Sequence, residues 1–344
     1  MKAYSFSIVY LVPFSVVFGY LLGGYFMLLT PFFVFVVVPL LDLVVGYDYK
    51  NPDPSQEKQL EQKKSFHILT WISMPISLGL VLWGSYVIST ESFSPLEFLA
   101  FTLSVGISSG VLGINASHEM QHRVNNKLEP FLARLTLLSS LYIHWGLEHI
   151  TGHHRWVATP EDPATAKINQ SYYRFWFQTV FGSVKSAWKF EKLRLQRQNN
   201  PHAILNNRVL QYLVSQLIFL TMLTLFFGYF ALLFFLIQSY IAISLLEIIN
   251  YIEHYGLLRE KTVEGKYESV KPYHSWNSSK RLTNWFLFNL QRHSDHHYKP
   301  GRRYQILRHF EEAPQLPTGY AGMVLIALVP PLFKHIINKR IPAH

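Results

Sequence analysis

Cysteine is absent from this 344-residue chain, and charged residues make up only 15% of it. The absence of cysteine excludes disulfides, thiolate metal sites and cysteine nucleophiles. It also excludes a rubredoxin-like or ferredoxin-like iron centre within this sequence, because such centres need cysteine ligands. We therefore expect any electrons that the protein uses to come from another protein.

The low charge also indicates where the protein resides. Soluble domains carry roughly 25% charged residues, whereas this chain is 49% apolar and 16% aromatic, with a net charge of +10. Lys and Arg are missing from residues 3–49, 65–122 and 209–258 and gather between these stretches. This is the positive-inside pattern, which predicts that the basic segments are cytoplasmic. Because these basic segments are intervals between predicted spans, without a pattern of base-stacking aromatic residues, we expect no nucleic-acid partner.

Six apolar stretches are close to the roughly 20 residues that a bilayer-crossing helix needs. They form three pairs, joined by a Thr30-Pro31 turn, by the residues STESFSP and by Gly228. The predicted spans are residues 5–27, 29–46, 67–89, 96–116, 209–227 and 229–251. We predict an all-α, multi-pass integral membrane protein of the inner or plasma membrane, with six transmembrane helices in three hairpins. Residues 1–344 would form one membrane domain with both termini on the cytoplasmic side.

The predicted cytoplasmic segments, 117–208 and 252–344, would form a histidine-rich helical cap. Within them, residues 172–198 mix aromatic and basic side chains, which is typical of a helix that lies in the membrane interface. A helix that packs on the domain would look similar. The apolar stretch 319–333 is short for a span and contains Pro330-Pro331, so we expect it to be interfacial or re-entrant.

Histidines are concentrated in four segments close to the predicted cytoplasmic membrane boundary. The segments read HEMQH, EHITGHH, NYIEHYGL and QRHSDHH, and they contain His118, His122, His149, His153, His154, His254, His293, His296 and His297. Imidazoles four residues apart share one face of a helix, which is a metal-ligand geometry. Nine imidazoles are more than one ion can use and suit two. The sequence therefore predicts a two-metal site at the inner membrane boundary.

Other interpretations exist for the individual segments. A single histidine at a membrane interface is usually a structural residue, and HEMQH alone resembles a zinc-protease helix with Glu119 as the base. A zinc protease, however, uses three protein ligands and one open position. A divalent-metal transporter would place its ligands near the bilayer midplane in broken helices rather than at span ends. Imidazole alone does not select among zinc, copper, iron and nickel.

A carboxylate adjoins each histidine segment, namely Glu119, Glu148, Glu253 and Asp295. We expect these groups to accept the distal imidazole N–H and so to orient the ligands. A bridging carboxylate is an alternative role. For Asp295, a solvated interface acid is another.

The longer motifs closely resemble those of the membrane-bound alkane hydroxylases, the alkane 1-monooxygenases of the AlkB type. The matching segments are HEMQH, EHITGHHRWVATPEDPATAK, NYIEHYGL, LQRHSDHHYKPGRRYQILR, PLLDLVVGYDYKNP, KPYHSWNS and QLPTGY. They cover most of the chain from the second span onward. The wider histidine-box superfamily, which includes acyl desaturases and xylene monooxygenase, shares only the HxxxH and HxxHH spacing.

The resemblance implies a non-haem di-iron centre held by the nine histidines. It further implies that the terminal methyl of medium- to long-chain n-alkanes is hydroxylated to a 1-alkanol with O₂, with electrons supplied by rubredoxin and rubredoxin reductase. An acyl-chain desaturase or another hydrocarbon hydroxylase of the same superfamily is the alternative. Met120, Arg123, Tyr298 and Lys299 depart mildly from the family pattern, and all four lie outside the ligand positions.

An alkane has no polar group, so its binding must come from apolar burial, at about 0.8 kcal/mol per CH₂. We expect the transmembrane helices to hold the chain, with Val34, Phe35 and Val38 of the second span as part of the channel wall. Basic residues near the metal side would attract an acidic electron carrier or, alternatively, anionic headgroups. These residues are Lys185, Lys189, Arg194, Arg197, Lys299, Arg302, Arg303 and Arg308.

Overall fold

The structure is a computed structural model that describes residues 2–200 and 203–342. Within these residues every regular element is helical, and the only β-type pairings are isolated bridges. Five helical segments are long and apolar enough to cross a membrane, and they cover Ala3–Leu22, Gly24–Val45, Glu57–Thr90, Pro95–Gln121 and Arg208–His254. The protein is therefore an all-helical membrane protein.

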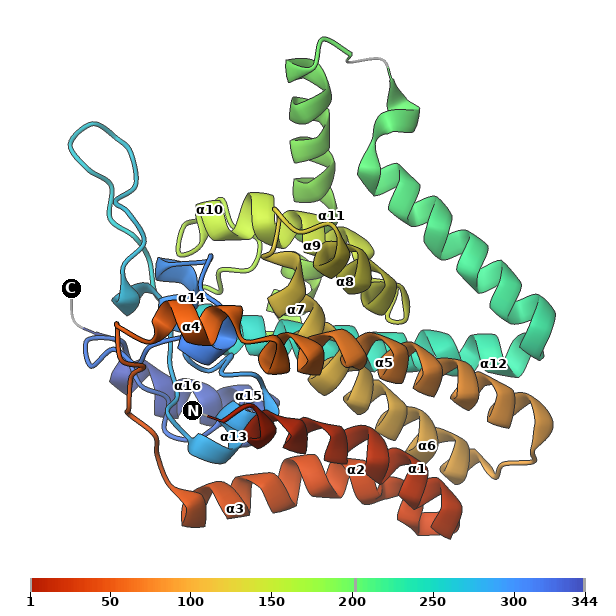
Figure 1. Ribbon diagram of the computed structural model, residues 1–344. Helices are drawn as coiled ribbons and strands as arrows, with labels where there is room; N and C mark the ends of the chain where they lie inside the picture. Colours follow the sequence, from red (N-terminus) through yellow and green to blue (C-terminus); the bar gives the residue numbers. More distant parts are fainter. Residues whose placement is uncertain (1, 201–202, 343–344) are drawn as a thin grey trace.

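The five segments are built from consecutive helices. They comprise η1 (Ala3–Tyr10) with α1 (Leu11–Leu22); η2 (Gly24–Leu28), α2 (Leu29–Phe32), η3 (Phe33–Val37) and α3 (Val38–Val45); α4 (Glu57–Gln62) with α5 (Lys64–Thr90); α6 (Pro95–Ser108), η4 (Ser109–Ile114) and α7 (Asn115–Gln121); and α12 (Arg208–His254). In Figure 1, α5, α6 and the second arm of α12 run side by side, and α1 to α3 lie beneath them.

The first hairpin turns at a different place from the one predicted. Gly23 and Gly24 have φ values of 73° and 53°, a backbone region that glycine enters without steric cost. Thr30 and Pro31 lie inside α2 instead. The prediction of a turn at Thr30-Pro31 was wrong because the positive-φ conformation selects the glycine pair, whereas proline is tolerated in the first turn of a helix.

The last long helix contains the third reversal. Gly228 has φ 80° and ψ −176° inside α12, which breaks the helix at the glycine predicted to join the last two spans. Figure 1 shows the two arms of α12 diverging from this point. At the second hairpin, Ser94 caps α6 through a reciprocal capping box with Glu97, which explains why the helix begins at Pro95.

Most of the remaining helices pack around the end of the bundle where α7 and α12 stop, whereas α11 (Tyr172–Arg197) projects away from it toward η6 (Ile204–Asn206) and the start of α12 (Figure 1). The others are α8 (Leu128–Leu138), α9 (Ile143–Glu148), η5 (His149–His153), α10 (His154–Trp156), η7 (Pro272–His274), α13 (Arg281–Phe286), α14 (His293–Tyr298), η8 (Tyr304–Ile306), α15 (Tyr320–Ala327), α16 (Pro330–Ile337) and η9 (Asn338–Arg340).

Two of these helical regions correspond to segments singled out in the sequence, the mixed aromatic and basic stretch 172–198 and the apolar stretch 319–333. α11 buries Phe175 and Ala187 and exposes Phe177 and Phe181. The apolar stretch 319–333 forms α15 and the start of α16, and its buried side chains belong to the same hydrophobic cluster as those at the end of α12. Proline 330 begins α16 rather than interrupting a helix, because the first helical position needs no backbone N–H partner.

Buried polar groups hold the start of α14, the helix that carries the last histidine segment. Arg292 is 1% exposed and donates to the carbonyls of Leu307, Asp48 and Lys50. Ser294 N donates to Asn277 Oδ1, and the Asn277 amide donates to Ser294 Oγ. These bonds fix the start of α14 against segments far apart in the sequence, and so they position its histidines.

Candidate metal centre

The structure brings all nine predicted histidines into two adjoining groups. The first group contains His118, His122, His149, His154 and His296, and the second contains His153, His254, His293 and His297. Within each group the candidate ligand nitrogens lie within 4.8 Å of one another. Each group therefore has the ligand count and convergence of a metal site.

The two consecutive histidine pairs each contribute to both groups. His153 and His297 belong to the second group, while their neighbours His154 and His296 belong to the first. The four-residue pair of His149 and His153 is also divided between the groups. Both imidazoles lie on η5, a π-helical turn, with their ring centroids 5.2 Å apart. The histidine pairs therefore tie the two groups together.

The spacing of the imidazole nitrogens suits metal coordination. In the first group, His149 Nε2 lies 3.1 Å from His122 Nε2 and 3.0 Å from His154 Nε2. In the second, His293 Nε2 lies 3.1 Å from His254 Nε2 and 2.9 Å from His297 Nε2. Ligands bound about 2.0–2.1 Å from one ion stand roughly 3 Å apart. The Nε2 atoms are therefore the metal-facing atoms.

Burial keeps most of these imidazoles in the neutral form that binds a metal. It lowers the pKa of His149, His296 and His297 well below the usual value. His153 is the exception. Burial alone would lower the pKa of His153, but the Asp162 carboxylate outweighs this effect and raises it.

Asp162 contacts a candidate ligand, and the sequence reasoning missed it. Its Oδ2 lies 3.0 Å from His153 Nδ1 and also accepts from the Thr165 hydroxyl, while its Oδ1 accepts from Ala164 N. A carboxylate on the distal nitrogen fixes the imidazole tautomer and leaves Nε2 for the metal. Asp162 lies in the loop nine residues after His153. Its presence in the EHITGHHRWVATPEDPATAK motif was the available signal.

Three of the four predicted carboxylate partners have other contacts. Glu119 accepts from Arg123, and Glu148 accepts from the Ser186 hydroxyl at 2.9 Å. Asp295 is fully buried and forms an ion pair with Arg302, so it is neither a solvated acid nor an imidazole acceptor. The prediction failed because proximity in sequence does not determine the direction of a side chain, and buried carboxylates pair with the nearest strong donors.

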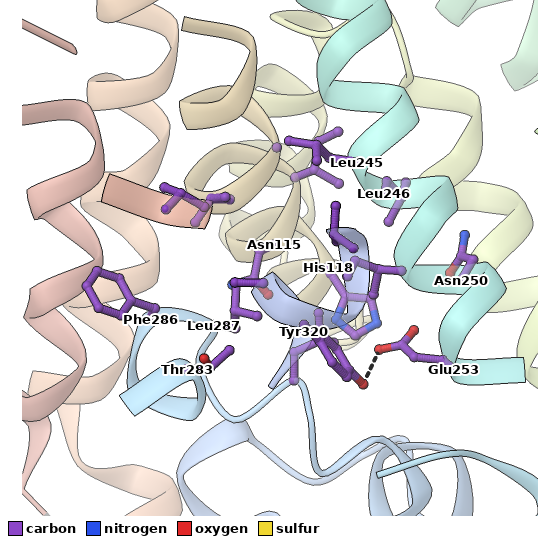
Figure 2. A pocket seen from close by; sticks show the side chains of 18 of the residues that line it. Asn115, His118, Leu245, Leu246, Asn250, Glu253, Thr283, Phe286, Leu287 and Tyr320 are labelled. Atoms are coloured by element: carbon purple, nitrogen blue, oxygen red, sulfur yellow. Dashed lines mark hydrogen bonds between the residues drawn. The ribbon is translucent and has the colours of Figure 1, made fainter. Parts of the chain in front are cut away.

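Glu253 differs from these three in the imidazole atom that it approaches. Its Oε2 lies 3.2 Å from His293 Nε2, which is the metal-facing nitrogen, and its Oε1 accepts from the Tyr320 hydroxyl at 2.7 Å. Figure 2 shows this Tyr320–Glu253 hydrogen bond beside His118. The predicted acceptor role on a distal nitrogen therefore does not fit Glu253, whose carboxylate faces the metal side of the second group.

An apolar cavity of about 90 Å³ ends on both histidine groups. His118 and His149 of the first group and His293 of the second line it. Figure 2 shows His118 and Glu253 toward one end and Leu245 toward the other. The predicted channel residues Val34, Phe35 and Val38 all line the same cavity.

Within the described residues, the three π-helical turns all border this site. η3 contributes Val34 and Phe35 to the cavity wall, η4 contributes Gly110 and Ile114, and η5 contributes His149. π-Helical turns occur frequently at functional sites because they redirect side chains within a helix. Here they aim wall residues and a candidate ligand toward one space.

Several of the predicted basic docking residues form ion pairs. Arg194 pairs with Glu191, Arg302 with Asp295, Arg303 with Glu129 and Arg308 with Glu57. Lys185, Lys189, Arg197 and Lys299 remain exposed. Fewer basic side chains are therefore available to a partner protein than the sequence suggests.

Comparison with known proteins identifies the family. The family model for fatty acid desaturases matches residues 94–326. The alkane 1-monooxygenase of Acinetobacter baylyi is 39% identical over 314 residues, which cover 91% of this chain and 76% of that protein. Alkane 1-monooxygenase 2 of Alcanivorax borkumensis is 37% identical over 352 residues, covering 100% of this chain and 92% of that protein. The chain belongs to the alkane 1-monooxygenase family.

The chain is also similar to a more distantly related hydroxylase. The hydroxylase component of xylene/toluene monooxygenase from Pseudomonas putida is 30% identical over 328 residues, covering 93% of this chain and 84% of that protein. The match to the fatty acid desaturase model begins at α6 and includes every histidine of both groups. The family resemblance predicted from the histidine motifs is confirmed.

Proposed function

We propose that this protein is a membrane-bound di-iron monooxygenase that converts medium- and long-chain n-alkanes to 1-alkanols. One atom of O₂ would enter the alcohol and the other would leave as water, with two electrons and two protons consumed. Its relatives are named alkane 1-monooxygenases, and the nine histidines supply imidazoles, a ligand type that suits iron. An acyl-chain desaturase or hydroxylase of the same superfamily is the alternative.

The observation that carries this proposal is the apolar cavity that ends on both histidine groups. Hydrocarbon walls with imidazoles at one end suit a substrate that has no polar group and reacts at its terminus. Bound iron would supply the O₂ chemistry that a strong terminal C–H bond requires. A desaturase would instead need to hold an interior carbon–carbon bond beside the metals.

The chain's own residues would orient the substrate and the ligands. The cavity wall would align the hydrocarbon with one methyl toward His118 and His293 and would exclude water from that end. Asp162 would keep the proton of His153 on Nδ1, so that Nε2 remains available to the metal. Tyr320 would hold the Glu253 carboxylate beside the second group.

We also propose the membrane topology predicted from the sequence. The break at Gly228 supports two crossings within α12, which with the other four long segments would make six spans in three hairpins. Two of the basic segments, 123–208 and 259–344, follow the long helical segments that end at Gln121 and His254, beside the histidines. The positive-inside pattern favours the cytoplasm for the end of the bundle that carries the histidines, for the helical cap and for both termini.

Electrons would come from rubredoxin, which rubredoxin reductase would reduce in turn. His122 and His154 are the two members of the histidine groups with partial solvent exposure. Lys299 follows α14, which carries three of the histidines, and Lys185 and Lys189 lie on α11. An acidic carrier would be attracted to this face, so the reduction rate should fall as ionic strength rises. A rate insensitive to salt would count against electrostatic docking.

Anaerobic purification followed by metal quantitation and single-turnover product analysis tests the proposal. The substrates are octane, dodecane and an acyl thioester. We expect two irons per chain and 1-alkanols from the alkanes. Unsaturated products from the thioester alone would favour the desaturase alternative, and a chain that binds zinc rather than iron would overturn the proposal.

A further inference from the structure

A second apolar space adjoins the cavity at the surface of the protein. It is a groove of about 510 Å³ between α11, α12 and α15, which we call the lateral groove. Its wall includes Trp176, Ser244 and Leu328. Phe35, Leu245 and Val324 line both the lateral groove and the inner cavity. These three residues come from three separate helical segments and form the partition between the two spaces.

The volume of the inner cavity limits how much of a hydrocarbon it can hold. An apolar cavity of about 150 Å³ holds a benzene molecule, whereas the inner cavity measures about 90 Å³. A medium-length alkane is much larger than benzene. With its reactive end at the histidines, such a chain must therefore extend beyond the inner cavity, and the lateral groove is the adjoining apolar space.

The polar atoms of three aromatic residues of the groove, Tyr172, Tyr173 and Trp176, already have hydrogen-bond partners. The Tyr172 hydroxyl donates to the Ser244 carbonyl at 2.8 Å, and Trp176 Nε1 donates to Ser244 Oγ at 3.1 Å. The Tyr173 hydroxyl donates to the Leu328 carbonyl at 2.8 Å. These bonds tie the polar ends of the side chains to the neighbouring helices, so the groove offers apolar surface without unpaired donors from these residues.

The outer rim of the lateral groove is apolar and exposed. Phe177 is 61% exposed, Leu325 44% and Leu328 42%. In a protein with several helices suited to the membrane, such an uncovered rim is compatible with contact to lipid acyl chains. The groove therefore connects the hydrocarbon phase with the partition at Leu245 and Val324.

We propose that the lateral groove binds the distal part of the hydrocarbon chain and is the route by which the substrate enters from the bilayer. This inference rests on the proposed function for the identity of the substrate. Leu245 and Val324 form the narrow passage, and the reactive end lies beyond them at the histidines. Short alkanes fit within the inner cavity, whereas longer alkanes occupy both spaces.

The absence of cysteine allows a site-specific test, because one introduced cysteine is the only thiol. Leu328→Cys places a thiol in the lateral groove. Leu99→Cys is the matched control, since Leu99 is exposed and lines a separate apolar groove that shares no described residue with the inner cavity. The rate of labelling by N-ethylmaleimide is measured anaerobically, without reductant, in the presence of dodecane or butane.

Occupancy of the groove should slow labelling by the factor 1 + [L]/Kd, which is about tenfold when dodecane is present at ten times its Kd. We expect this protection at position 328 with dodecane, no protection there with butane, and none at position 99. Equal labelling rates at position 328 with and without dodecane would overturn the proposal. Equal protection at both positions would also overturn it, because that result indicates nonspecific partitioning.

A second measurement uses the same variants under turnover. Attachment of an octyl methanethiosulfonate reagent at position 328 should lower kcat/KM for dodecane, and reductive release of the octyl group should restore it. The same reagent at position 99 should leave kcat/KM unchanged. Because labelling protection requires no oxidation, a chain that shows protection but oxidises no alkane refutes the proposed activity while the hydrocarbon groove stands.

Discussion

The Asp162 carboxylate lies 3.0 Å from Nδ1 of His153, and Nε2 of the same imidazole lies 3.2 Å from Nε2 of His297. One ring nitrogen of His153 is thus bound by a carboxylate, and the other points toward the remaining histidines of the second group. Asp162 and His153 are both buried, so water does not replace the carboxylate. A carboxylate in this position sets both the orientation and the basicity of a metal-binding imidazole.

Asp162→Asn should weaken metal binding at the second group. Loss of such a partner costs about 10- to 100-fold in metal affinity or activity, because the amide no longer stabilises the Nδ1–H tautomer as a carboxylate does. Metal content after dialysis against a graded chelator measures the effect. Glu161→Gln, at the exposed neighbouring residue, should match the wild type. Equal retention of metal by Asp162→Asn and wild type would refute the orienting role.

Removal of one imidazole should have unequal effects in the two groups. His254→Ala leaves three histidines in the second group, whereas His154→Ala leaves four in the first. We expect His254→Ala to lose about one metal per chain and His154→Ala to retain more, because four imidazoles still satisfy a common coordination number. Metal quantitation on purified protein measures this, and His335→Ala at an exposed histidine is the control. The opposite ranking would contradict the assignment of ligands to groups.

A larger side chain in the cavity wall should change the preferred alkane length. Val38 is 4% exposed and lines the inner cavity, so Val38→Phe reduces the space beside the histidines. Longer alkanes should lose turnover relative to shorter ones, and chromatographic product yields across an alkane series measure this shift. Leu40→Phe, on the same helix but 58% exposed, should leave the profile unchanged. An unaltered length profile in Val38→Phe would show that the second span does not set chain length.

A buried ion pair away from the metals gives a pH-dependent prediction for stability. Glu191 is 1% exposed and accepts hydrogen bonds from Arg208 Nε and Arg194 Nη2, each at 2.9 Å. Burial alone would raise the pKa of Glu191, but the hydrogen bonds from Arg208 and Arg194 lower it to about 2. A lowered carboxyl pKa stabilises the folded state above the unfolded-state value, near 4.3, and this stability is lost as the pH falls toward 2.

Glu191→Gln should therefore destabilise the protein at pH 7 by about 1.5–3 kcal/mol, the range for hydrogen bonds to charged groups. The difference from wild type should shrink as the pH falls below about 4, because the unfolded wild-type chain then binds a proton at Glu191 that the folded protein still lacks. Thermal unfolding midpoints of both proteins, measured from pH 7 to pH 3, would test this trend. Glu264→Gln, in an exposed pair with Lys266, should have little effect. A difference that stays constant across this range would contradict the ion-pair explanation.

Local patterns in the sequence sufficed to predict the helices and to select the histidines that the structure brings together. Long apolar stretches without Lys or Arg can satisfy their backbone groups in a membrane only as helices or closed barrels. Histidines four residues apart at the ends of such stretches lie on one helix face, which is why all nine could be selected without coordinates. Gly228 was also accessible, because a lone glycine between two apolar stretches marks a reversal.

Properties that depend on contacts between distant segments required the tertiary structure. The division of His153 from His154, and of His296 from His297, depends on how η5 and α14 face each other across more than a hundred residues of chain. Asp162 was overlooked and Glu119, Glu148 and Asp295 were misassigned, because a carboxylate pairs with the donor that the fold brings to it. The lateral groove, too, exists only where α11, α12 and α15 meet. Sequence spacing determines which residues share a helix face, whereas only the packing of helices determines what that face meets.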